Sequence, residues 1–225
     1  MKRIITILTI LMSAVVFAQD TTEKTIGEFS ELKVYDLIQV ELVKSDIDKV
    51  VITGDHRNNV LVNNKSGKLK IKMNFEKSFN GAKTKVVLYY TKIDVIDVNE
   101  GAQVKSDDLI KQFEVDLRAQ EGGSIDVPVD VTYTNIKAVT GGIVETSGIS
   151  KNQKVSLLTG GIYKGEALKT EVTEVTINAA GEAYIHASKL ADVKVRAGGD
   201  VYIYGNPETI NESKVFGGRI KRMDI

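Results

Sequence analysis

The chain has 225 residues, of which 42% are hydrophobic, 27% charged and 6% aromatic, and it contains no Cys and no Trp. Its 30 Lys and Arg residues balance 30 Asp and Glu residues, so no basic excess exists to neutralise phosphates, and nucleic acid is excluded as an expected partner. The lack of cysteine excludes a disulfide framework, a thiolate metal site and a cysteine nucleophile.

The first 18 residues have the pattern of a secretory signal peptide. Lys2 and Arg3 precede an apolar-rich run over residues 4–17, and Ala18 is a small residue at the expected cleavage point. The run is too short for a transmembrane helix, which needs about 20 apolar residues. We therefore predict export, no transmembrane segment after cleavage, and a flexible mature N-terminus over residues 19–26.

Short alternating runs follow in the N-terminal part of the chain. Ile38, Val40 and Leu42 alternate with polar neighbours, and residues 69–73 repeat this pattern after the turn-forming stretch 63–67. We expect these runs to form strands that start a sheet and cap the remainder of the domain.

Glycines recur at intervals of about 20 residues in the rest of the chain. In seven copies a glycine stands three residues before a Val, Ile or Tyr. These aligned glycines are Gly101, Gly122, Gly141, Gly160, Gly181, Gly199 and Gly217. The period is typical of one turn of a solenoid, whereas helical repeats need about 33 residues.

Strand-like runs flank these glycines. Residues 193–195 before Gly199 and residues 201–203 after it each place apolar side chains at every second position. Glycine suits the corner between two strands because it accepts positive φ and a close approach of neighbouring backbone. The sequence therefore predicts an all-β fold, a parallel β-helix with about seven Gly-cornered rungs, as a single domain over residues 27–225. Charged residues near the C-terminus, Arg219, Lys221, Arg222 and Asp224, are expected to protect the end of the helix from edge pairing.

Several of these runs carry a family resemblance. Residues 29–34, 40–42, 50–55 and 67–71, together with the later Gly-Gly rungs, resemble the putative autotransporter adhesin, head GIN domain, family of secreted Bacteroidetes-type proteins. The resemblance covers nearly all of the mature chain. It implies a right-handed β-helix, a location in the periplasm, at the surface or outside a Gram-negative bacterium, and no established activity.

Aromatic residues form the sharpest local pattern. Tyr163, Tyr184 and Tyr202 occupy equivalent positions in three successive repeats, and His186 and Tyr204 follow the last two. With rungs about 4.8 Å apart, outward-facing rings at these positions would form a ladder. The ladder either stabilises the sheet by stacking or offers a flat ligand platform to a sugar or peptide, so these five residues are the candidate site.

Three functions remain open at this point. No Gly-x-Ser-x-Gly, His-Glu-x-x-His or phosphate-loop pattern occurs, so we predict no catalytic, cofactor or metal residues and expect a non-enzymatic adhesion-type module for a glycan or protein. The second interpretation is a polysaccharide-active β-helix enzyme, which requires carboxylates that converge. Its candidate residues are Asp94, Asp97, Asp116, Asp126 and Asp130. The third is a purely structural envelope protein.

Overall fold

Alternation of apolar and polar residues produces strands along nearly the whole chain. The computed structural model describes residues 21–223, and strands account for 69% of the chain against 3% for helix. The strands are β1 (Thr22–Thr25), β2 (Glu31–Val34), β3 (Gln39–Lys44), β4 (Lys49–Gly54), β5 (Val60–Lys65), β6 (Lys68–Met73), β7 (Thr84–Tyr90), β8 (Val95–Val98), β9 (Gln103–Ser106), β10 (Ile110–Gln120), β11 (Ser124–Val139), β12 (Ile143–Leu158), β13 (Gly161–Ile177), β14 (Gly181–Ala197), β15 (Asp200–Tyr204), β16 (Thr209–Phe216) and β17 (Arg219–Arg222). Two short 3-10 helices are η1 (Arg57–Asn59) and η2 (Phe75–Lys77).

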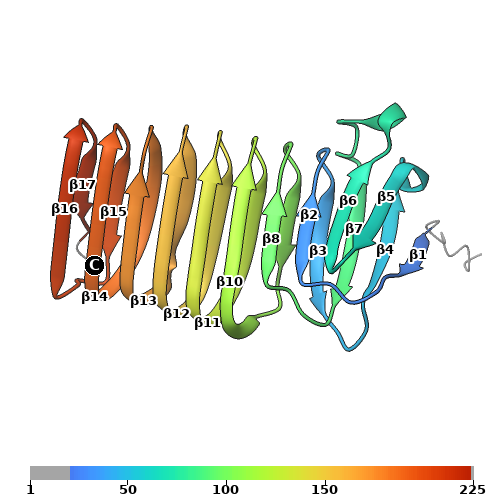
Figure 1. The fold of residues 1–225 in the computed structure, drawn as a ribbon, viewed down its shortest axis with the longest axis horizontal. Coiled ribbons are helices and arrows are strands. Elements are labelled where there is room, and N and C mark those ends of the chain that lie inside the picture. The colour runs from blue at the N-terminus through green and yellow to red at the C-terminus, as the bar shows by residue number, and fades with distance from the viewer. Residues whose placement is uncertain (1–20, 224–225) are drawn as a thin grey trace, which may run out of the picture.

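The strands stack into a parallel β-solenoid of about seven turns (Figure 1). Strands β10 to β14 pair in parallel, each with the next. The first part of β14 pairs with β15 and its second part with β16, so each long strand contributes to two sheets. We call the outer side of the sheet containing β9, β15 and β17 the first face, and the outer side of the sheet containing β8 and β16 the second face.

Inward side chains form columns along the solenoid axis. One column contains Ile125, Val144, Tyr163, Ala183 and Val201, which are in register and buried. Burial of each large aliphatic side chain contributes about 1.5–3 kcal/mol. The core is therefore continuous from rung to rung.

From β8 onward, the corners between the second face and the first face are tight turns. In the corner before β12, Thr140 and Gly141 both have positive φ, 50° and 71°. The next residue, Gly142, lies so close to the preceding rung that a Cβ atom would stand 2.1 Å from the carbonyl oxygen of Ala119. Glycine is therefore needed at the second position for space, and at the first for backbone conformation.

The N-terminal part adds further rungs in an order that differs from the chain order. Strand β2 lies between β6 and β8, and β3 lies between β7 and β9, all in parallel. Strands β4 and β5 extend the two sheets in antiparallel fashion, through β7 and β6 respectively. This segment starts the sheets, as the alternating pattern predicts.

The last described rung places charges where earlier rungs place apolar residues. Glu212 and Lys214 on β16 are in register with buried Val193 and Val195, and Arg222 on β17 is in register with buried Ile203. Inward-pointing charges disfavour pairing with another sheet edge. Arg222 thus has the predicted protective position, whereas Arg219 and Lys221 contact outward side chains, and Asp224 lies outside the described residues.

The predicted fold class is confirmed, and two details of the sequence interpretation differ. The repeat alignment is wrong by one residue at Gly181 and Gly199, because each is the second residue of its corner and stands two, not three, residues before the inward Ala183 or Val201. Residues 19–26 are predicted to be flexible, whereas Thr22–Thr25 form β1, which pairs with β4. The predicted signal peptide over residues 1–18 lies outside the described residues.

Candidate functional site

Tyr163 points into the core, so its predicted outward orientation is wrong. Its side chain is 0% exposed, and it is in register with Ala183, not with Tyr184. A slip of one residue moves a side chain to the opposite side of a sheet, which explains the error. Gly165 leaves room for the ring, since a Cβ there would lie 2.1 Å from the Tyr163 hydroxyl.

Inside the solenoid, Tyr163 belongs to a buried polar chain. Its hydroxyl contacts Thr146 Oγ1 at 2.7 Å and accepts a hydrogen bond from Gln153 Nε2. Gln153 in turn accepts a hydrogen bond from Thr173. Burial raises the pKa of Tyr163, so the phenol remains protonated, and its hydroxyl is satisfied by two side chains of the neighbouring strand β12. Its role is structural.

Tyr184 and Tyr202 lie on the first face, as predicted. They are in register on β14 and β15, and their rings stack with centroids 4.7 Å apart and an interplanar angle of 11°. Nearly parallel rings at this separation overlap face to face with an offset. Lys221 Nζ lies 5.8 Å from the Tyr202 centroid and extends the stack to the next rung. The two rings therefore form a ridge. The ring faces that overlap are covered by each other, and Lys221 lies over Tyr202.

The hydroxyl groups and neighbours of this ridge are polar. The Tyr184 hydroxyl donates to Glu182 Oε2 at 3.2 Å, and partial burial followed by the Glu182 charge raises the pKa of Tyr184. His186 and Tyr204 are in register beside the pair. We define the tyrosine ridge as Tyr184, Tyr202, His186 and Tyr204; its ligand-binding role stays a prediction.

A groove of about 390 Å³ runs across the rungs of the first face toward the tyrosine ridge. Its polar lining includes Gln39, Glu41, Lys85, Gln103, Lys105, Ser124, Asp126, Glu145 and Lys164. Lys164 is the residue in register with Tyr184, so the groove ends where the ridge begins. Partial burial, with the nearby carboxylates Glu145 and Asp107, raises the pKa of Asp126.

A second hollow, of about 470 Å³, adjoins His186 of the ridge at the turn after β15. It is lined by His186 together with Asn206, Pro207, Arg222 and Met223. The sequence interpretation missed this turn after β15, although its Gly-Asn-Pro composition is a turn signal.

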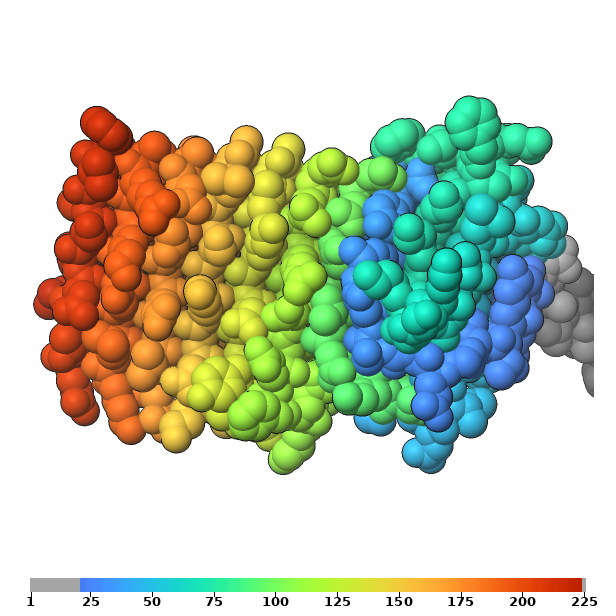
Figure 2. Space-filling view, viewed as in Figure 1, coloured from blue at the N-terminus to red at the C-terminus, as the bar shows by residue number. Residues whose placement is uncertain are grey.

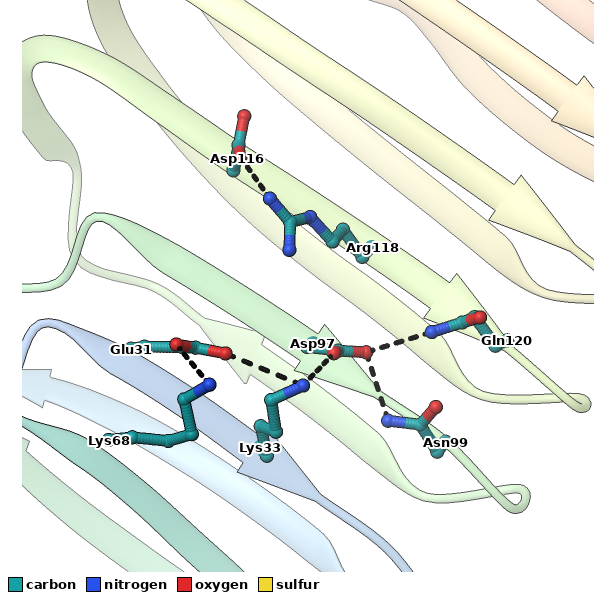
Figure 3. Close-up of polar contacts among 8 residues, drawn as sticks. All are labelled: Glu31, Lys33, Lys68, Asp97, Asn99, Asp116, Arg118 and Gln120. Atoms are coloured by element: carbon teal, nitrogen blue, oxygen red, sulfur yellow. Dashed lines mark hydrogen bonds and ion pairs between the residues drawn. The ribbon is translucent and has the colours of Figure 1, made fainter. Parts of the chain in front are cut away.

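The second face carries a cluster of paired charges (Figure 3). Asp97 accepts hydrogen bonds from Lys33 at 2.7 Å, Asn99 at 2.9 Å and Gln120 at 3.2 Å. Burial alone would raise the pKa of Asp97, but these donors outweigh it and hold the pKa below its ordinary value. A carboxylate so fully satisfied joins strands and is poorly suited to proton transfer.

The other candidate carboxylates are dispersed. Asp116 pairs with Arg118 at 2.5 Å, and Asp94 pairs with Lys92 at 2.9 Å, on the second face. Asp126 lies in the first-face groove, and Asp130 pairs with Lys111 near the bend of β11. Within residues 21–223, no group of three His, Asp or Glu side chains is arranged to hold a metal ion. Over the same residues, no helix has the length and apolar character needed to cross a membrane.

Solved structures share this architecture. A putative adhesin from Bacteroides fragilis NCTC 9343 superposes with a TM-score of 0.83 at 18% identity, covering 91% of this chain and 96% of that one. A putative adhesin and a putative lipid binding protein, both from Parabacteroides distasonis ATCC 8503, give TM-scores of 0.72 and 0.71 at 17% identity, with the same coverage. At these identities the likeness establishes the fold alone.

The family assignment rests on sequence. No curated protein matches the chain. The family model described as "Putative auto-transporter adhesin, head GIN domain" matches residues 28–207, most of the chain, and confirms the resemblance found in its strand and glycine patterns. The chain therefore belongs to the head GIN domain family.

Proposed function

We propose that this protein is an exported, non-enzymatic adhesion-type module of the cell envelope that binds a glycan along its first face. In this proposal residues 1–18 are a cleaved signal peptide and residues 27–225 form one domain. A protein partner is the second candidate for the same face. Membership of the head GIN domain family supports an adhesion role.

The observation that carries the proposal is the groove that leads to the tyrosine ridge. Its walls offer carboxylates, ammonium groups and amides, which suit the many hydroxyls of a sugar. Successive rungs are about 4.8 Å apart, close to the length of one sugar unit, so an extended glycan along the axis meets one charged side chain of the same register column at each unit. That column contains Glu41, Lys105, Asp126, Glu145 and Lys164. The exposed edges and hydroxyls of Tyr184 and Tyr202 then contact the sugar at the end of the groove.

The enzyme interpretation receives less support from the geometry. Glycoside hydrolysis uses two carboxyl groups about 5–10 Å apart that flank one bond. Here Asp97 and Asp116 are bound to basic or amide groups on the second face. Asp126 lies on the first face in register with Glu145, but the Glu145 carboxylate pairs with Lys164 at 3.3 Å. Incubation of the protein with the glycans it binds is expected to release no new reducing ends.

A glycan array with matched variants tests the proposal. Replacement of both ridge tyrosines, Tyr184→Ser with Tyr202→Ser, is expected to lower affinity for the bound glycan by about tenfold, because each aromatic contact contributes about 0.5–1.5 kcal/mol. The control is Phe113→Ser with Tyr133→Ser, a second exposed aromatic pair, 5.4 Å apart, at the bend of the solenoid.

Two outcomes would contradict the proposal. Glycan binding that is unchanged in the ridge variant, with only a lower melting temperature, would assign the stack a structural role. Absence of any glycan ligand, together with a ridge-dependent protein captured from an outer-membrane extract, would establish the protein partner instead.

A further inference from the structure

One corner of the solenoid differs from all those that follow it. Between β6 and β7 the chain does not make a tight turn but extends through residues 74–83, which project beyond the strand ends (Figures 1 and 2). Phe75 in this loop is 98% exposed and Phe79 is 62% exposed. Large apolar side chains held in water at a projecting tip are typical of a contact surface.

The loop is held in this shape by hydrogen bonds that are buried or half-buried. The Asp36 carboxylate, which is buried, accepts from the backbone N–H of Met73 at 3.0 Å, the hydroxyl of Ser78 at 3.1 Å and the backbone N–H of Phe79 at 2.9 Å. The side chain of Asn74 caps η2 by accepting from the N–H of Lys77. The exposure of the two phenylalanines is thus imposed by the fold and is not a consequence of a loose loop.

Positive charge is concentrated around this loop. Residues 57–85 contain eight Lys and Arg residues and one acidic residue. Three of these cations pair with carboxylates elsewhere in the fold, Lys68 with Glu31, Lys83 with Asp55 and Lys85 with Glu41, so the charge at the loop comes chiefly from Lys70, Lys72 and Lys77. Lys70 and Lys72 are exposed on β6, and Leu61, also exposed, is in register with Lys72 on β5. A hollow of about 270 Å³ lies at the base of the loop between these lysines and Phe75, with Glu100 on its wall.

We propose that the loop of residues 74–83 and the adjoining lysines of β6 form a docking surface for a lipid bilayer that carries anionic headgroups. Phe75 and Phe79 enter the interface between headgroups and acyl chains, and Lys70, Lys72 and Lys77 contact the phosphates. This function is separate from ligand binding at the tyrosine ridge.

The combination of side chains favours a bilayer over a soluble polyanion. A sulfated or phosphorylated polymer would be bound by the lysines alone and gives Phe75 no apolar surface to enter. Interfacial membrane binding needs both terms, since apolar burial and attraction to anionic lipid each supply part of the affinity. The exposed phenylalanines and the lysines lie together at this one corner.

Vesicle co-sedimentation tests the proposal with the purified protein. Binding is expected to vesicles of phosphatidylcholine mixed with phosphatidylglycerol, to weaken as salt is raised, and to be much weaker to phosphatidylcholine alone. The double variant Phe75→Ser, Phe79→Ser is expected to lower binding about tenfold or more, because two buried aromatic side chains are lost. Lys72→Gln with Lys77→Gln is expected to lower it by about tenfold on the mixed vesicles only.

Controls separate docking from folding and from simple charge attraction. Phe113→Ser removes an exposed aromatic at the bend and is expected to leave vesicle binding unchanged, and all variants alter exposed or half-exposed positions, so their melting temperatures serve as the folding check. The proposal is overturned if the wild type does not bind the mixed vesicles, if the phenylalanine variant binds them normally, or if heparin is bound equally well by wild type and phenylalanine variant and displaces the vesicles.

Discussion

The two glycines of a corner are needed for different physical reasons, and the distinction is clearest at Gly141 and Gly142. Gly141 has φ of 71°, and no atom lies within 4 Å of the position that a Cβ would take, so only backbone conformation selects glycine there. Gly142 has no positive φ, yet the position of its Cβ would be occupied by the carbonyl group of Ala119. One is a conformational requirement and the other a packing requirement.

Alanine substitution is expected to separate these two costs. Gly142→Ala should lower the free energy of unfolding by about 3 kcal/mol, because backbone of the neighbouring rung must move. Gly141→Ala should lower it by about 1 kcal/mol, the cost of a left-handed conformation for a residue with a Cβ. Urea unfolding of both variants measures the difference, and equal losses would contradict the assignment.

At the scale of elements, Asp97 joins the N-terminal rungs to the rest of the solenoid. Its three donors come from β2, from the corner after β8 and from β10 (Figure 3). Glu31 extends the cluster by pairing with Lys33 at 3.4 Å and with Lys68 at 3.0 Å on β6. The cluster therefore joins β2, which lies between β6 and β8 in the sheet, to strands on both sides of it.

The lowered pKa of Asp97 predicts a defined pH dependence of stability. The folded state favours the ionised carboxylate, so this stabilisation is complete above the unfolded pKa of about 4 and is lost as pH falls through the lower folded value. Asp97→Asn should therefore cost about 2 kcal/mol at pH 7, and the difference from wild type should shrink in acid.

Asp94→Asn is the matched control for that measurement. Asp94 pairs with Lys92, and both side chains are substantially exposed, so its loss should change stability by less than about 0.5 kcal/mol. Chemical unfolding of both variants and the wild type across the acid range measures these differences in the free energy of unfolding. A constant difference between Asp97→Asn and wild type at every pH would contradict the role assigned to the charge.

The sequence predicted the repeat but not its register at every copy. The period of the glycines and the alternation of strands such as residues 201–203 are local signals, and they were sufficient for the solenoid and its corners. Gly181 and Gly199 misled the alignment because a single residue type serves two positions of the corner. The two positions of a corner differ in how closely they approach the backbone of the preceding rung, which lies about 20 residues earlier in the sequence.

The same limitation applies to the candidate site. Tyr184 and Tyr202 were correctly placed outward, since their own strands alternate clearly, whereas Tyr163 was misplaced by the slip at the next corner. The sequence gives only a weak signal for the projecting loop with Phe75, namely its Lys-rich, acid-poor context. Its importance depends on exposure, which only packing determines.

For the whole molecule, the repeat implies that one complete rung can be removed. Ser124 is in register with Ile143, so deletion of residues 124–142 joins equivalent points of successive rungs. We expect a shorter protein that remains β-rich and unfolds cooperatively with a smaller urea m-value, because less surface is exposed on unfolding.

A half-rung deletion provides the contrast. Removal of residues 124–132 eliminates the first-face part of β11. The second-face part of β11 then cannot reach the strands with which it is in register. That variant should fail to fold or should aggregate, as judged by circular dichroism and gel filtration. Equal folding of both deletions would show that rung register does not control assembly.

The parallel ladder of β10 to β14 also has a mechanical consequence. Its backbone hydrogen bonds point along the long axis of the solenoid, so a pull between the two ends is shared by every bond of a rung at once. A pull on the chain terminus instead loads the bonds of β17 and β16 one after another. The solenoid should therefore resist a pull between its two ends more strongly than it resists peeling of the chain from its C-terminal end.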